Sequence, residues 1–201
     1  MDGSEPPRQL TNDLREGGYP VWTADARIIF SSARAGSRTL WQVPAAGGEP
    51  EPLTTGAGVD DEADLSRDGQ RLVYSNARKS WTLMIANADG GEERELLERR
   101  TEIVFPQFSP DGRSIAFFGR NDRAVGIFTI GADSKDLRAL TGGTELNHMP
   151  RWSHDGAWVY FFQMRPELSF RRVPALGGAS EFALPLVWET HNFPQFDPSG
   201  R

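Results

Sequence analysis

The segment "PQFSPDGRSIAFF" (106–118) consists of a short apolar run, a turn and a second apolar run, and similar segments recur along the chain. The copies are "PVWTADARIIF" (20–30), "ADLSRDGQRLVY" (63–74), "PRWSHDGAWVYFF" (150–162) and a shortened "PQFDPSGR" (194–201). The third turn residue falls at Asp25, Asp68, Asp111, Asp155 and Ser199, at intervals of 43, 43, 44 and 44 residues. A fixed period of this length is typical of a repeat architecture, and it decides the fold.

One period predicts four short strands. Residues 106–108 form a strand opened by a proline, which is tolerated at a first strand position. Residues 109–112, "SPDG", suit a type I turn with proline second and glycine fourth. The continuous apolar run at 115–118 predicts a strand buried on both faces. A third strand follows at 127–130, and a short fourth strand at 137–141 completes the period.

The other periods have the same order. Third strands are expected at 39–43, 82–86 and 169–173. Fourth strands centre on Leu10, Leu53, Leu96, Leu140 and Leu184. Four short strands in every 40–45 residues, with no helical periodicity, are the signature of a propeller blade. The predicted fold is therefore an all-β propeller of four-stranded antiparallel blades; a sandwich would not explain the period, and a helical solenoid would need amphipathic helices.

The blade boundaries predict a single, incomplete propeller domain over residues 1–201. Four complete blades are expected at about 12–54, 55–98, 99–141 and 142–185, with partial strands at both ends. Residues 1–11 match the end of a preceding blade, and 186–201 match the start of a following one. We hypothesise that the chain is part of a six-bladed or larger ring; the alternatives are an atypical closed ring and an oligomer. Open blade edges would favour self-association.

Several motifs carry a family resemblance. "FSPDGRSIAFF", "WSHDGAWVYFF", "VPAAGGEPEPLT" and "GADSKDLRALT" are similar to the Ser-Pro-Asp-Gly repeats of TolB-like propellers, over essentially the whole chain. The resemblance implies a ring used as a protein-binding platform in a bacterial envelope complex, or as the sensor or interaction domain of a larger bacterial protein. Such blades also precede the hydrolase domain of prolyl-oligopeptidase-like peptidases. The chain departs from the motif at Ala26, where glycine is expected, and at Ala63 and Arg67, where prolines are expected.

The composition of the chain limits the kinds of partner and site that can be expected. With 22 basic and 28 acidic residues the net charge is −6, which argues against nucleic acid because no basic excess can neutralise phosphates. Cysteine is absent, which excludes disulfides and cysteine-ligated metals. No apolar stretch is long enough for a membrane span, so no membrane insertion is expected. No signal peptide is visible at the start of the sequence; the compartment is expected to be the periplasm if the parent protein carries one, and the cytoplasm otherwise.

No catalytic, cofactor or metal site is predicted. The chain lacks the G-x-S-x-G string of a serine hydrolase and a glycine-rich phosphate loop, and its histidines, at 148, 154 and 191, form no H-x-x-x-H pair. The turn aspartates recur in every blade, which favours a role in the turns over catalysis. We therefore predict a noncatalytic protein-binding platform. The alternative is the propeller domain of a prolyl-oligopeptidase-like serine peptidase whose catalytic domain lies outside this chain.

Two sets of positions are expected to have different roles. Packing between blades is assigned to one repeat position, occupied by Trp22, Leu65, Phe108, Trp152 and Phe196. The residues just before each first strand differ from blade to blade, as a binding site would require. A basic or polar peptide segment is predicted to bind at one channel mouth, at Asp61, Glu62, His148, Arg151, His191 and Asn192. The alternative is a solvated loop rim. Because two histidines are included, binding is expected to change between about pH 5 and 8.

Overall fold

A computed structural model describes residues 8–11, 17–56, 58–78, 80–99, 101–120, 124–142, 147–164 and 167–184. Within these residues sixteen strands form four antiparallel sheets of four strands each. Blade 1 contains β1 (Gly17–Trp22), β2 (Arg27–Ser32), β3 (Thr39–Pro44) and β4 (Glu51–Pro52). Blade 2 contains β5 (Val59–Leu65), β6 (Arg71–Ala77), β7 (Trp81–Asn87) and β8 (Arg94–Arg99). Blade 3 contains β9 (Ile103–Phe108), β10 (Ser114–Arg120), β11 (Val125–Gly131) and β12 (Arg138–Ala139). Blade 4 contains β13 (Asn147–Trp152), β14 (Trp158–Gln163), β15 (Ser169–Pro174) and β16 (Glu181–Leu184).

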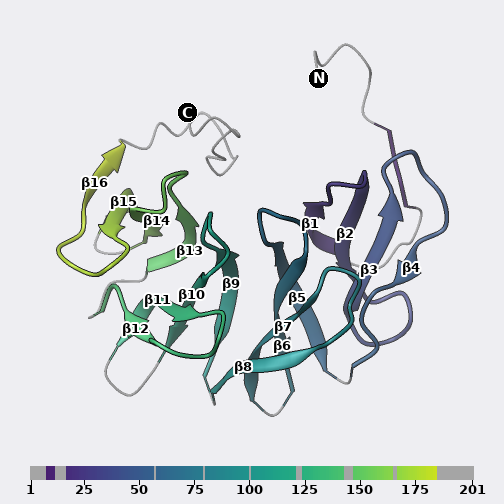
Figure 1. Ribbon diagram of the computed structural model, residues 1–201, viewed down its shortest axis with the longest axis horizontal. Coiled ribbons are helices and arrows are strands. Elements are labelled where there is room, and N and C mark those ends of the chain that lie inside the picture. The colour runs from purple at the N-terminus through teal and green to yellow at the C-terminus, as the bar shows by residue number, and fades with distance from the viewer. Residues whose placement is uncertain are drawn as a thin grey trace.

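The four sheets stand side by side along an arc. In each sheet the strands pair in sequence order, so that β1, β5, β9 and β13 are innermost and β4, β8, β12 and β16 lie at the periphery (Figure 1). The sheets of blades 1, 3 and 4 lie within the predicted ranges, whereas β8 of blade 2 ends at Arg99, one residue past the predicted end at 98. The predicted extent of the domain stays a prediction. The predicted all-β propeller of four-stranded antiparallel blades is confirmed. No helix occurs among the described residues, and so none there is long and apolar enough to cross a membrane.

Apolar side chains between neighbouring sheets form the core. One cluster joins blades 2 and 3 and contains Val73, Leu83, Phe108, Ile115 and Phe128. A second joins blades 3 and 4, and a third joins blades 1 and 2. Strand β10 contributes to both of its interfaces, because its central residues are buried on either face, as the continuous apolar run predicted. Burial of apolar surface on both faces of each sheet is therefore the main force that holds the blades together.

The turn between the first two strands is held by its serine and aspartate. In blade 3 the Ser109 hydroxyl donates to Asp111 Oδ1 (2.6 Å) and accepts the N–H of Ser114 (2.9 Å), while Asp111 Oδ1 also accepts the N–H of Arg113 (3.0 Å). The same bonds recur in blades 2 and 4. The serine hydrogen bond is the main cause that lowers the pKa of Asp111. The recurring aspartates are therefore bound into the turns of blades 2 to 4.

Blade 1 has a shorter version of this turn. The paired residues Thr23 and Arg27 are four positions apart, whereas Ser109 and Ser114 are five apart. Ala26 nevertheless takes the left-handed conformation of the glycine it replaces, with φ 60° against 65° at Gly112. An alanine in this conformation is strained because its Cβ approaches the backbone.

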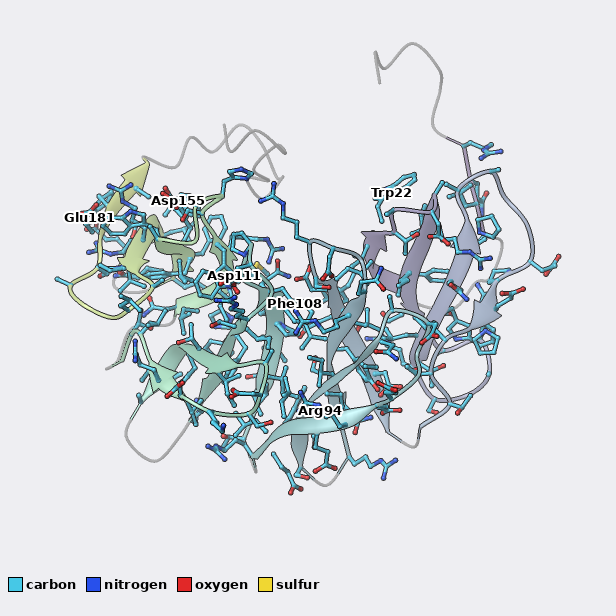
Figure 2. All side chains as sticks on the ribbon, in the orientation of Figure 1. Trp22, Arg94, Phe108, Asp111, Asp155 and Glu181 are labelled. Carbon is cyan, nitrogen blue, oxygen red and sulfur yellow. The ribbon has the colours of Figure 1, made fainter. Side chains whose placement is uncertain are left out.

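The residues that were predicted to pack between blades do not all do so. Phe108 is buried, and Leu65 and Trp152 pack against the interblade clusters. Trp22, however, is 58% exposed, so the prediction of a buried side chain is wrong there. Its side chain stands at the open side of the arc, whereas Phe108 lies between blades (Figure 2). Leu65, Phe108 and Trp152 each contact the preceding blade, and the described residues include no such sheet beside blade 1. Phe196 lies outside the described residues.

Arginines also connect the blades at their outer strands. Arg94 donates to the carbonyl of Ala132 in the next blade (2.5 Å), and Arg138 donates to the carbonyl of Leu176 (3.1 Å). Arg8 donates to the carbonyl of Ala46 in blade 1 (2.8 Å). Each of these bonds spans 38 residues. Arg8 therefore has the position relative to blade 1 that an outer-strand arginine has relative to the following blade. The prediction that residues 1–11 end a preceding blade stays a prediction.

The strained turn of blade 1 leads to a stability prediction. We expect Ala26→Gly to raise the free energy of unfolding by about 1 kcal/mol, because glycine removes the left-handed strain and loses part of this gain through greater freedom in the unfolded chain. The matched variant Gly112→Ala should lower it by about 1–2 kcal/mol. There a Cβ would lie 2.5 Å from Nη2 of Arg71, at a φ of 65°. Urea unfolding followed by circular dichroism measures both. Destabilisation by Ala26→Gly would contradict the assignment of strain to Ala26.

Candidate functional site

Every innermost strand contains a β-bulge. The pairing with the second strand shifts between Gly18 and Val21 in β1, and equivalent shifts occur in β5, β9 and β13. At each shift one residue other than glycine has a positive φ; these are Tyr19 (52°), Glu62 (54°), Phe105 (56°) and Met149 (55°). Proline follows three of these residues and Ala63 follows the fourth. Proline lacks an N–H to pair, so a bulge accepts it without loss of a ladder hydrogen bond.

The bulges bring side chains of different blades together at the centre of the arc. The ring centroids of Tyr19 in blade 1 and Phe105 in blade 3 are 6.4 Å apart, in an edge-to-face arrangement. The Phe105 ring lies 6.3 Å from that of His148 in blade 4. Side chains of non-adjacent blades can meet in this way only if they project towards the axis. A bulge that re-aims a side chain is a recurrent feature of binding sites.

A groove of about 800 Å³ follows the inner strands. Its walls come from all four blades and from the turns after β5, β9 and β13. The lining residues that bear on its chemistry are Tyr19, Trp22, Glu62, Asp64, Arg67, Phe105, Gln107, Arg151 and His154. Tyr19 and Trp22 are 47% and 58% exposed, so two aromatic side chains are available to a ligand. The groove is both aromatic and charged.

Glu62 lies among other negative charges. Its Oε2 accepts the N–H of Phe105 (2.7 Å) and the hydroxyl of Ser75 (3.3 Å). Burial, together with the nearby charges of Asp61 and Glu102, raises the pKa of Glu62 to about 7, and the Phe105 N–H partly offsets the rise. Burial, and after it the neighbouring negative charges, therefore favour the protonated form of Glu62.

Asp64 is compensated by a cation. Its Oδ2 accepts the N–H of Phe108 (2.8 Å), which links blade 2 to blade 3. Burial raises the pKa of Asp64 to about 6, although the Phe108 N–H and the charge of Arg151 act against the rise. Burial lowers the pKa of Arg151, and Asp64 opposes that shift. Each group thus stabilises the charged form of the other.

The remaining carboxylates of β5 are engaged with blade 1 and with their own blade. Asp61 pairs with Arg38 of blade 1 at 2.6 Å between Oδ2 and Nη1. Asp60 is buried, and it accepts bonds from Thr54 (2.6 Å) and Asn76 (2.5 Å). Burial raises the pKa of Asp60. These two groups hold blade 2 against blade 1.

The structure separates the predicted site residues. Glu62 and Arg151 line the groove, and Asp61 lies beside it in its pair with Arg38. His148 stacks on Phe118 at 4.1 Å, and burial lowers its pKa. The two remaining members, His191 and Asn192, lie outside the described residues. The described members of the set also lie within strands, because β5, β9 and β13 begin earlier than the apolar pattern indicated.

Sequence reasoning did not identify Tyr19 and Trp22 as groove residues. The signal for Tyr19 was present, because the residue before the repeated proline is the bulge residue in three blades. The signal for Trp22 was misleading, since its repeat position is used for packing in the other blades.

A second hollow, of about 920 Å³, lies on the turn side of blade 3. Arg71, Arg94 and Arg138 line it, and each donates to a backbone carbonyl of the next blade. The other charges around it include Asp111, Asp133, Asp136 and Asp155. Its arginines are thus engaged in holding the blades, and its charges are mixed. Among the described residues no cluster of histidine, cysteine, aspartate or glutamate suits a metal ion.

Two relatives align with the repeats. An uncharacterized protein of Agrobacterium fabrum is 26% identical over 187 residues, which covers 90% of this chain and 62% of that protein. The Tol-Pal system protein TolB of Legionella pneumophila is 28% identical over 100 residues, which covers 44% of this chain and 24% of TolB. No family model matches the sequence. The chain therefore aligns with less than two thirds of either relative.

Solved structures also resemble this chain in their fold. TolB of Acinetobacter baumannii superposes with a TM-score of 0.78 over 99% of this chain and 50% of that one, at 16% identity. The chain therefore has the β-propeller fold of TolB. A puromycin hydrolase superposes with a TM-score of 0.72 over 89% of this chain and 33% of the hydrolase, at 17% identity. At these identities the superpositions establish the propeller fold and leave the activity open.

The raised pKa of Glu62 predicts a pH dependence of stability. Its pKa is about 7 in the folded chain and near the usual 4.5 when unfolded, so between these values the folded state binds more protons. The contribution of Glu62 to stability therefore falls as pH rises from about 4.5 to 7. We expect Glu62→Gln to become more stable relative to wild type across this window, by about 1–2 kcal/mol at pH 8 after allowance for partial exposure. Urea unfolding at pH 5, 6, 7 and 8 measures the difference.

The control for this prediction is Glu51→Gln, an exposed carboxylate of β4. Urea unfolding of this variant over the same pH range serves as the reference for loss of an exposed carboxylate. A difference between Glu62→Gln and wild type that is constant from pH 5 to 8 would contradict the raised pKa.

Proposed function

We propose that this propeller is a noncatalytic interaction module that receives an extended, basic or polar segment of a partner protein in its central groove. The observation that carries the proposal is the set of four bulges, which keep one backbone shape while presenting tyrosine, glutamate, phenylalanine and methionine. Packing between blades favours similar side chains at equivalent positions, whereas recognition of one ligand requires different ones. Variable side chains on a rigid scaffold are the usual arrangement of a binding surface.

The groove has the chemistry of a peptide site. Its exposed aromatic side chains, Tyr19 and Trp22, offer large contact areas with little loss of conformational freedom on binding. Polar groups of the same wall, including Gln107 and Arg151, can pair with the ligand backbone. A volume of about 800 Å³ accommodates several residues of an extended chain.

For the whole protein we propose a role in a bacterial envelope complex, or as the sensor or interaction domain of a larger bacterial protein. The TolB relatives support it, because they are proteins of the Tol-Pal system. Periplasmic placement belongs to the first of these roles.

The second candidate is the propeller domain of a serine peptidase, which the superposition with puromycin hydrolase favours. The two candidates differ in what the chain alone can do. A fluorophosphonate probe should leave the chain unlabelled, because the sequence has no nucleophile elbow. Stoichiometric labelling of one serine would instead make this chain an enzyme.

Peptide selection tests the proposed function. We expect a random twelve-residue display library, selected on the immobilised chain, to yield basic or polar peptides with micromolar affinity. Tyr19→Ala and Trp22→Ala should weaken binding about tenfold or more, as is usual for aromatic anchors. Tyr19 is 47% and Trp22 58% exposed, so we expect both variants to fold. Fluorescence anisotropy with labelled peptides measures the affinities.

The matched control is Phe182→Ala, since Phe182 is 64% exposed on β16 and lies outside the groove. Its affinity should equal that of wild type. If Tyr19→Ala and Trp22→Ala bind normally while Leu176→Ala does not, the peptide binds on the turn side of the propeller and the groove is not the site.

A further inference from the structure

Three carboxylates of β5, in the groove or beside it, differ in how their charge is balanced. Asp61 has Arg38 at 2.6 Å, and Asp64 is stabilised by the charge of Arg151. Glu62 is in none of the ion pairs formed among the described residues, and the neighbouring charges of Asp61 and Glu102 are both negative. Glu62 is therefore the groove carboxylate whose negative charge the described residues leave uncompensated. A ligand cation would supply the missing charge.

The aromatic residues Tyr19 and Phe105 line the groove together with this carboxylate. The backbone N–H of Phe105 donates to Glu62, which fixes the start of the Phe105 side chain beside it. The Tyr19 ring meets the Phe105 ring edge-to-face, and the pKa of Tyr19 is raised by burial and then by the charge of Glu62. A carboxylate next to two aromatic rings is an arrangement that favours a cation over a neutral group.

The hydrogen bonds of Glu62 narrow the choice of cation. The bonds from the Phe105 N–H and the Ser75 hydroxyl both end on Oε2, which leaves Oε1 as the oxygen that can accept from a ligand. An arginine fork needs two carboxylate oxygens for bidentate pairing. A lysine ammonium is a compact charge that needs only one.

We propose that the groove binds a lysine side chain of its ligand, with the ammonium on Glu62 Oε1 and the alkyl stem against the rings of Tyr19 and Phe105. This proposal rests on the proposed function, because it names the group by which the peptide is recognised. Bound cation stabilises the ionised carboxylate, so binding is coupled to loss of the Glu62 proton.

The test uses a ¹⁵N-labelled full chain and three small probes, n-butylammonium, n-butylguanidinium and n-pentanol. The amide of Phe105 reports on the site because it donates to Glu62. We expect n-butylammonium to shift this resonance saturably, to bind about threefold more tightly than n-butylguanidinium and at least tenfold more tightly than n-pentanol. Between pH 6 and 8 its affinity should rise about tenfold, as a carboxyl with a pKa of about 7 ionises.

Variants identify the groups responsible. Glu62→Gln should abolish both the preference for n-butylammonium and its pH dependence, and Tyr19→Leu should weaken binding several-fold. Phe182→Ala, on β16 and outside the groove, should leave binding unchanged. The titratable groups that act on Glu62 or feel its charge are Tyr19 on β1, Asp61 on β5 and Glu102 before β9, and His148 on β13 lies beside the Phe105 ring. His148→Gln should retain the pH dependence, because burial lowers the pKa of His148.

Equal affinity for the three probes, or unchanged binding by Glu62→Gln, would overturn the proposal. If selected peptides bind in the groove but n-butylammonium is not preferred, the lysine site fails and the proposed function stands. If n-butylammonium binds as expected but no peptide does, the cation site stands and the proposed function fails.

Discussion

Each sheet of this propeller is apolar on both faces and is therefore stable only when another sheet covers each face. Strand β10 illustrates the constraint, because its central residues are buried against blade 2 on one side and blade 4 on the other. The repeat has the same origin, since a sheet that packs on its neighbour must resemble it in width and twist. The polar bonds are additions to this packing: arginines join the outer strands, and turn aspartates fix the hairpins. At Trp22 one face has no described neighbour, and a side chain of the packing position is exposed there.

The bulges separate recognition from this packing. A regular strand alternates its side chains between the two faces of the sheet, and both faces are needed for the core. An extra residue with positive φ breaks the alternation and adds a side chain that points to neither neighbour. Tyr19 and Phe105 reach each other across the axis for this reason. Positive φ costs of order 1 kcal/mol or more at a residue with a Cβ. Its recurrence at one position in all four blades indicates that the conformation is built into the fold, and it leaves the identity of the side chain free to vary.

The fold was readable from the sequence because packing and turn chemistry both repeat. The period, the "SPDG" turns and the third strands at 82–86 and 127–130 all correspond to observed elements. The candidate site was readable only in part, since the sequence indicated which positions vary but not where they point. Glu62 and Asp61 are adjacent in β5, and only the bulge places one in the groove and the other beside Arg38. His148 was predicted from its place in a stretch that varies between blades, whereas its stacking on Phe118 depends on a contact between blades that no local pattern encodes.

The wall of the groove is also the seam between blades. Glu62 and Asp64 of blade 2 accept backbone N–H groups of blade 3, and the indole of Trp152 in blade 4 donates to the Gln107 carbonyl. The bulge leaves the N–H of Phe105 without a ladder partner, and Glu62 satisfies it; the carboxylate is thus required by the backbone irrespective of any ligand. Because that bond uses one oxygen, the seam can persist while the other oxygen receives a ligand. The packing of blade 2 against blade 3 buries Glu62, and this burial raises the pKa of Glu62. Burial disfavours the ionised form of Glu62 in the free propeller, and a bound cation offsets that cost. The carboxylate that joins two blades is thus also the source of cation selectivity in the groove.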